Sequence, residues 1–171
     1  MEKSYFLMHF NHDVHLLTDP VAYASNEWAA EPQQMGPGFH FMVDSERLHD
    51  YLMNNSNLPL MSERMKSLFS GVNGAEKTTW FKVDVLDRNA RAWPYYIPYF
   101  KKAPRVLNRR KSEMVDDILV RAVFDAAKVG ELEFFPVGPG AEIRLVVSGR
   151  MKEVLEKAGL TGLAFAPVEV V

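Results

Sequence analysis

Three histidines close to the start of the chain have the spacing that comes nearest to a metal site. His9, His12 and His15 follow one another at intervals of three residues, and Asp13 could add a carboxylate. Imidazole and carboxylate groups are typical zinc ligands, so this pattern would suit a metal-dependent hydrolase. On a strand, however, His12 would face away from His9 and His15, and on a helix the three rings would drift around one side. We therefore favour polar or half-buried histidines at a strand end, and we expect no bound metal or other cofactor.

A second pattern with catalytic residue types is Ser-x-Arg-Met-Lys, which occurs twice. Ser62 lies four residues before Lys66, and Ser148 lies four residues before Lys152, so each pair would share one helical face. A serine nucleophile needs further groups, and neither occurrence has a tyrosine or an oxyanion-type glycine run near it. We therefore interpret both serines as helix N-caps, which accept a hydrogen bond from a backbone N–H of the first turn, and both lysines as part of a solvated face.

These two patterns belong to longer repeat units, residues 61–85 and 147–170. In both units apolar residues recur with the i, i+4, i+7, i+8 spacing of an amphipathic helix. Gly71 and Gly159 stand where a helix C-terminus favours a residue with positive φ. Each unit then ends in a short run with strand character, residues 79–85 and 163–170. The repeat predicts two helix–strand units, which describe architecture rather than chemistry.

The composition is that of one folded, soluble domain. With 171 residues, 47% of them hydrophobic, the chain can bury a substantial core, so a single domain over 1–171 is expected. The sequence has no cysteine, which removes disulfides, thiolate catalysis and zinc–thiolate sites. The apolar run before His9 is too short for a signal-peptide core, and no stretch approaches the roughly 18 apolar residues of a membrane span. We therefore expect a cytoplasmic protein without a membrane partner.

Charge is distributed unevenly along the chain. Residues 1–86 carry 6 Lys or Arg against 11 Asp or Glu, a net charge of −5, whereas residues 87–171 carry 14 against 11, a net charge of +3. Such an asymmetry can steer a charged partner. It is too weak to indicate a general nucleic-acid-binding protein, whose domain is usually strongly basic.

The segment 88–111 concentrates the positive charge. It contains eight basic residues and no acidic one, interleaved with Trp93, Tyr95, Tyr96, Tyr99 and Phe100. Aromatic rings beside Arg and Lys can stack bases in a single-stranded nucleic-acid groove, and the same residue types form hot spots of protein interfaces. A third alternative is a core strand over 95–100 followed by a solvated loop. Pro98 and Pro104 favour an edge strand that runs into an ordered loop.

The other predicted elements alternate between strands and helices without a strict βαβ order. Strands are expected at 4–10 and 39–43, a short helix between 44 and 53, and a hairpin formed by 131–137 and 142–147 about the turn Gly138-Pro139-Gly140. Together with the repeat units, these elements predict an α+β fold, a mixed and mostly antiparallel sheet with helices packed on one side.

Two segments are less clearly patterned. Residues 18–38, which include Trp28, are punctuated by Pro and Gly and are expected to form a long loop. In residues 112–129 the periodicity favours a helix, whereas the β-branched and aromatic residues between 118 and 124 favour a strand. Periodicity alone leaves both alternatives open.

The C-terminal part of the chain contains four characteristic motifs, Glu133–Pro136, Leu145–Ser148, Met151-Lys152 and Leu160–Val168. In these motifs it resembles a family of predicted immunity proteins, and the region around Met61–Arg64 is similar to the middle of the same family. Members are encoded beside toxins in bacterial polymorphic toxin systems, and a myxobacterial domain typifies the family. The resemblance covers residues 58–170 and is weak over 1–57. It implies that 118–124 is a strand.

The resemblance implies a non-enzymatic protein that binds one cognate toxin and blocks it in the producing cell. No catalytic residue carries over. We expect the basic aromatic segment to supply the interface anchors, and Trp28 to supply a second patch; the anchor candidates are Trp93, Tyr95, Tyr96, Tyr99, Arg109 and Arg110. If the toxin is a nuclease with a basic active site, the acidic first half is the better docking face. The alternatives are a nucleic-acid-binding regulator that uses 88–111 and the N-terminal histidine hydrolase.

Overall fold

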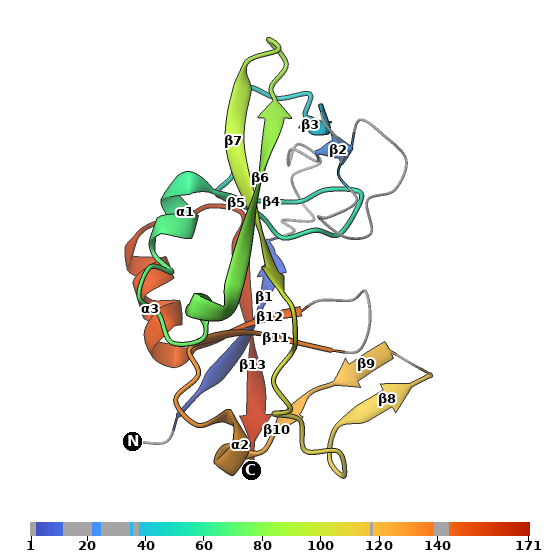
Figure 1. Ribbon diagram of the computed structural model, residues 1–171, viewed down its shortest axis with the longest axis vertical. Helices are drawn as coiled ribbons and strands as arrows, with labels where there is room; N and C mark the ends of the chain where they lie inside the picture. The colour runs from blue at the N-terminus through green and yellow to red at the C-terminus, as the bar shows by residue number, and fades with distance from the viewer. Residues whose placement is uncertain (1–2, 12–21, 25–34, 36–37, 117, 139–143) are drawn as a thin grey trace.

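Two β-sheets account for most of the computed structural model, which describes residues 3–11, 22–24, 35, 38–116, 118–138 and 144–171 (Figure 1). In spatial order, one sheet contains β2 (Tyr23–Ala24), β3 (His40–Met42), β6 (Thr78–Leu86), β7 (Ala92–Phe100), β5 (Leu60–Ser62) and β4 (Tyr51–Leu52). The other contains β10 (Val123–Phe124), β13 (Leu163–Val170), β1 (Tyr5–Phe10), β12 (Arg144–Ser148) and β11 (Phe134–Val137). A separate two-stranded hairpin consists of β8 (Glu113–Val115) and β9 (Ile118–Arg121).

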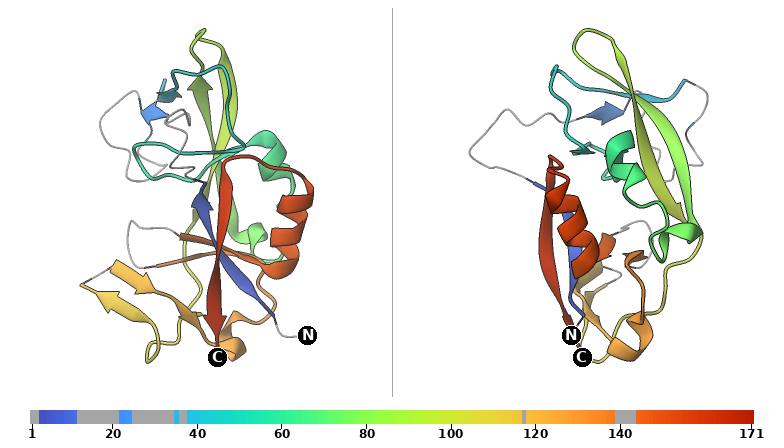
Figure 2. Two further views of the ribbon diagram at one scale, coloured as in Figure 1. Left: turned by 180° about the vertical axis from the view of Figure 1, so that it is seen from behind. Right: turned by 90° about the vertical axis from the view of Figure 1, so that its left-hand side faces the viewer.

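The described helices are short. They are α1 (Glu63–Ser67), α2 (Ala126–Val129) and α3 (Gly149–Lys157), together with the 3-10 turn η2 (Ala75–Lys77). Figure 1 and Figure 2 show α1 and α3 on the same side of the molecule, α3 next to the sheet of β1 and β13 and α1 next to the long β6–β7 hairpin. Met65 and Phe69 from the α1 region meet Met151 and Leu155 of α3 in one buried cluster, which also takes in residues of both sheets. Each of these two helices therefore inserts one or two buried side chains into a core that the two sheets share.

The expected α+β architecture, with helices on one side of a single sheet, is wrong. The described structure is mostly β, because the aromatic and β-branched residues of 78–86 and 92–100 extend into two nine-residue strands that pair along their whole length. The amphipathic pattern of each repeat unit is real, but it lasts for only five residues in α1 and nine in α3. Neither helix is long enough to cover a sheet face.

The helix expected between 44 and 53 is also absent. Ser45 forms a local turn instead of a cap, since its hydroxyl accepts a 3.0 Å hydrogen bond from the Arg47 N–H. Tyr51 and Leu52 are buried and form β4, where they pair with β5. The burial of Tyr51 and Leu52 in a strand outweighs the helical spacing of the apolar residues, a common result for short apolar runs.

Three of the four predicted helix ends are confirmed. The hydroxyls of Ser62 and Ser148 each accept a 3.1 Å hydrogen bond from the backbone N–H three residues later, so both serines are N-caps. Gly159 follows the C-cap of α3 with a φ of 63°, whereas α1 ends at Ser67, so Gly71, with a φ of 73°, belongs to the turns after the helix. The strand alternative for 118–124 is confirmed as well, because these residues form β9 and β10, and only the four-residue α2 follows.

The two large sheets are built to the same plan. The order β3-β6-β7-β5-β4 in one corresponds to β10-β13-β1-β12-β11 in the other. In each, the first pair is parallel and the other pairs are antiparallel. We call them the N-terminal unit (β2 to β7 with α1) and the C-terminal unit (β10 to β13 with α2, α3 and β1). Strand β1 thus occupies in the C-terminal unit the place that β7 has in the N-terminal unit.

Individual side chains repeat with this plan. Tyr5 lies opposite Ser148 and Tyr95 lies opposite Ser62 in the corresponding strand pairs. Both tyrosines are buried, and each hydroxyl donates to a backbone carbonyl oxygen, that of Gly130 for one and of His49 for the other. The duplication therefore extends well beyond the helix–strand segments in which the sequence repeat is visible.

Reciprocal backbone hydrogen bonds join the two units. The N–H of Tyr51, at the start of β4, donates to Thr161 in the linker after α3, and the N–H of Phe134, at the start of β11, donates to Asn73 in the linker after α1. A glycine comes next in each linker, Gly162 in one and Gly74 in the other. A Cβ on either glycine would lie 2.2 Å from the carbonyl oxygen of Tyr51 or Phe134, respectively.

We predict that Gly162→Ala lowers the free energy of unfolding by about 3 kcal/mol or more. The new methyl group would collide with backbone and would also hold a positive φ of 78°. Gly71→Ala is the matched control, since its φ is 73° but no atom lies within 4 Å of the added Cβ, so a loss of about 1 kcal/mol is expected. Urea denaturation of both variants measures the difference. Equal losses would contradict the close approach of the two units.

Candidate partner-binding surface

The basic aromatic segment 88–111 does not form one surface. Its first part lies at the turn of the β6–β7 hairpin, and its last part lies in the chain that leads to β8, at the opposite end of the molecule (Figure 1). A single-stranded nucleic-acid groove needs stacked aromatic rings and cations along one path. Arg91 lies over the Trp93 ring at one end, but the segment does not line up its aromatic rings and its remaining cations along one path.

Trp93 belongs to the β6–β7 end and is 43% exposed. Its indole N–H donates a 3.0 Å hydrogen bond to the Asp87 carboxylate, which also accepts from the Arg91 guanidinium at 2.9 Å. The backbone N–H groups of Asn89 and Arg91 donate to the same carboxylate. The hydrogen bond from Trp93, supported by those from Arg91 and Asn89, lowers the pKa of Asp87 to about 2. Trp93 is thus oriented by an ordered turn.

The three tyrosines of β7 are in different environments. Tyr95 is buried, and it supports the core rather than the surface. Tyr96 points to the opposite face, where its hydroxyl donates to Glu63 at 3.2 Å and the Lys66 ammonium lies 4.0 Å from the ring centre. Tyr99 is half-buried and packs edge-on against Phe81.

The expectation that this segment is an edge strand is wrong, because β7 lies between β6 and β5 in the sheet. Within β7, only Tyr95 and Tyr96 pair with β5, so Pro98 has a paired strand on the β6 side alone. The proline is tolerated at this point because it does not have to donate to a second strand.

Arg109 and Arg110 lie in the exposed turn that leads into β8. The Arg110 N–H donates to the side-chain oxygen of Asn108 at 3.1 Å, and neither guanidinium makes an ion pair with the described residues. These two cations therefore remain available at the surface. Trp28, the other expected anchor, lies outside the described residues.

Only His9 of the possible metal ligands lies in the described part of the chain, in β1 opposite Ala164. Partial burial, followed by the charge of Arg144, lowers the pKa of His9. His12, Asp13 and His15 lie outside the described residues. Among the residues that are described, no three His, Asp or Glu side chains gather in a way that could hold a metal ion.

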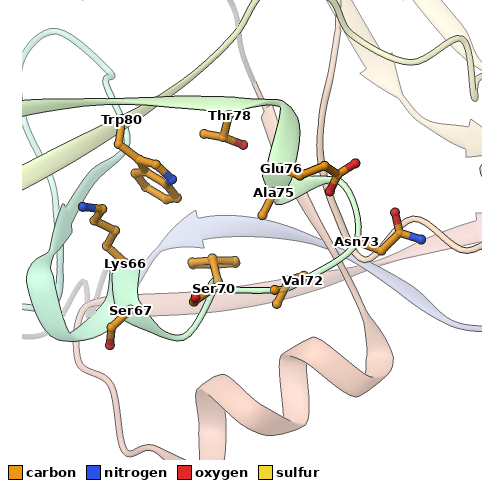
Figure 3. Close-up of a pocket in the computed structure, with 11 residues that line it drawn as sticks. Lys66, Ser67, Ser70, Val72, Asn73, Ala75, Glu76, Thr78 and Trp80 are labelled. Atoms are coloured by element: carbon orange, nitrogen blue, oxygen red, sulfur yellow. The ribbon is translucent and has the colours of Figure 1, made fainter.

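A groove of about 630 Å³ lies between α1, the following linker and β6 (Figure 3). Figure 3 shows Lys66 beside Trp80 at one end and Glu76 at the other, so these two charged groups do not form an acid–base pair. The hydroxyl of Thr78 is buried and has no hydrogen-bond partner among the described residues.

A smaller groove of about 370 Å³ has the corresponding position under α3, with Lys152 in place of Lys66. The Lys152 ammonium lies 5.1 Å from the Phe6 ring centre, as Lys66 lies over Tyr96. Both grooves therefore follow from the duplicated packing of a helix beside a sheet rather than from a site built for one ligand.

The largest concentration of exposed apolar side chains is on the β8–β9 hairpin. Four large hydrophobic residues are 44% to 59% exposed there: Met114, Val115, Ile118 and Val120. The sequence contained a signal for this surface, two short β-prone runs on either side of Asp116-Asp117, but the helical periodicity of 112–129 concealed it. This hairpin is the candidate site that sequence reasoning missed.

Comparison with known families completes the description. The profile of an immunity protein family (Imm11) matches residues 2–170, essentially the whole chain. The chain belongs to the Imm11 immunity protein family. The resemblance found in the C-terminal motifs is thereby confirmed, and the match also takes in the first 57 residues, where the motifs were weak. A search of curated protein sequences finds no match to the chain.

Membership of the Imm11 family indicates a role in immunity to a toxin. The described residues contain no helix that is long and apolar enough to cross a membrane. The geometry is consistent with recognition of a large partner, because the grooves are open and the exposed apolar residues lie on protruding strands.

We predict that the contribution of Asp87 to stability is lost at low pH. Its pKa is about 2 in the folded protein and near 4 in an unfolded chain, so the carboxylate stabilises the fold fully above pH 4 to 5. This stabilisation falls as the pH drops through 4 towards 2. The difference in melting temperature between the wild type and Asp87→Asn should therefore be largest near neutral pH and shrink at pH 2 to 3. A difference that stayed constant with pH would contradict the assigned hydrogen bonds.

Proposed function

We propose that this Imm11 protein binds a cognate toxin encoded nearby and neutralises it in the cytoplasm of the producing cell, without catalysing a reaction. The observation that carries the proposal is the family match over residues 2–170. The surface supports it, since the described residues offer exposed apolar strands and unpaired cations, and Lys66 and Glu76 lie at opposite ends of the groove beside α1.

Neutralisation requires an interface of ordinary size with a few buried anchors. Stable protein complexes bury about 1,600 Å² in total, and a small number of aromatic, aliphatic and Arg side chains supply most of the affinity. The candidates fall on two separate surfaces, Trp93 with its ordered turn at one end, and Arg109 with Arg110 beside the β8–β9 hairpin at the other. Tyr96 and Tyr99 lie between these ends on β7. Tyr95 is buried, so it stabilises the core rather than contacting a partner.

Co-expression with the product of the neighbouring gene tests the function. We expect the tagged Imm11 protein to co-purify with that product and to relieve the growth arrest that it causes when expressed alone. A catalytically inactive variant of the toxin should still co-purify, because the proposal is one of binding. Failure of both co-purification and growth rescue would exclude this toxin as the partner, and a rescue without any complex would contradict neutralisation by binding.

A further inference from the structure

We propose that the β8–β9 hairpin is the element of this protein that docks on the toxin, an inference that rests on the proposed function. The expected partner surface is an apolar strip or an unpaired strand edge, with carboxylate groups beside it. Three properties of residues 105–116 and 118–121 carry this inference. The apolar side chains of the hairpin are exposed, its root (the end where Ser112 meets Val123) is fixed, and unpaired cations lie next to that root.

The apolar side chains of the hairpin are exposed to an unusual degree for a folded protein. Val115 and Ile118 are paired across the two strands, and both are at least half exposed. Strand β8 pairs only with β9 in the described structure, so its other edge presents backbone N–H and C=O groups next to apolar side chains. Proteins usually protect such an edge with Lys, Pro or a covering element, because it readily pairs with another chain.

The root of the hairpin is held firmly. The Ser112 hydroxyl donates to the Val123 carbonyl oxygen and accepts from the Val123 N–H, at 3.1 and 3.0 Å, and Asn108 N–H donates to the same carbonyl oxygen at 2.8 Å. Leu119 is fully buried in the core of the C-terminal unit. Arg121 reaches Glu169 of β13 at 2.6 Å. A two-stranded ribbon is marginally stable alone, so these contacts preorganise it for binding.

The charges next to the hairpin define the partner further. Arg105, Arg109, Arg110 and Lys111 are exposed, and none of them forms an ion pair with the described residues. In contrast, Arg121 is already paired with Glu113 and Glu169. Unpaired cations beside an apolar strip attract and orient a partner that carries carboxylates beside its own apolar contact. We therefore expect acidic residues of the toxin to face the root of the hairpin.

The test measures binding of the purified neighbouring-gene product to hairpin variants by calorimetry. The double variant Ile118→Ser with Val120→Ser should bind at least about 30-fold more weakly, because two apolar anchors lose their side chains. Val154→Ser on α3 is the matched control, since Val154 is also exposed, at 39%, but lies on another element. The control should bind like the wild type.

A second double variant tests the inference without changing the apolar side chains of the hairpin. Arg109→Glu with Arg110→Glu changes only exposed side chains, and it should weaken binding by at least about tenfold, with a larger loss at low salt than at high salt. Circular dichroism and melting temperature verify that each variant is folded. If both double variants bind like the wild type, the docking inference is overturned while the proposed function stands.

Two further outcomes separate the alternatives. If the wild type does not bind the neighbouring product at all, the proposed function fails, and the hairpin inference fails with it. If sedimentation shows that the wild type self-associates, and the Ile118→Ser, Val120→Ser variant abolishes self-association but retains toxin binding, the hairpin contacts a second copy of this chain. That result would also overturn the inference.

Discussion

The reciprocal contact between the two units is the constraint on which the rest of the structure depends. Each helix is followed by a linker whose backbone pairs with the first strand residue of the other unit, Thr161 with Tyr51 and Asn73 with Phe134. A carboxylate supports one of these junctions directly, since Asp50 accepts hydrogen bonds from the N–H of Thr161 and from the Ser62 hydroxyl. Glu133 has the corresponding position in the other unit. Because the two units are hydrogen-bonded to each other at both junctions, α1 and α3 need to insert only a few buried side chains into the cluster that the sheets share, Met65 from α1 and Met151 and Leu155 from α3.

This arrangement leaves the outer regions free to differ. Buried side chains such as Tyr5 and Tyr95 fill the interior of each unit. The buried side chains of α1 and α3 belong to a cluster that the two sheets share. The β6–β7 turn and the β8–β9 hairpin lie away from that cluster, at opposite ends of the molecule (Figure 1). A duplicated scaffold that is fixed at its centre can thus carry different recognition elements at its ends, as is usual for loops on a rigid framework.

Local features of this fold were predictable from the sequence, and long-range features were not. Ser62 and Ser148 could be predicted as N-caps because capping depends only on hydrogen bonds within one helical turn. The helix expected between 44 and 53 failed because Tyr51 is held by strand pairing and by Thr161, far away in the chain. The α+β expectation failed for the same reason, since apolar spacing does not reveal whether a residue is buried against a helix or within a sheet.

The candidate site was predictable only in part. The composition of 88–111 pointed to Trp93, Arg109 and Arg110, which are exposed, but it could not show that Trp93 lies near the start of a nine-residue strand and the arginines beyond its other end. The apolar hairpin was missed because alternating and helical spacing are hard to distinguish over so few residues. The resemblance to the family came from motifs that are structural, and the family match over residues 2–170 confirms it; both point to the role without marking the surface that performs it.

The position of β1 has a consequence for how the protein is made. This strand precedes the other described elements in the chain, but its two neighbours, β12 and β13, come long after it. On the ribosome the N-terminal unit can pair its own strands as they emerge, whereas β1 keeps its apolar side chains unpacked until β12 and β13 have been synthesised. Pairing over such a sequence separation also slows folding. A product that stops short of β12 would leave β1 without either partner, so the second unit can close only after both of these strands have been made.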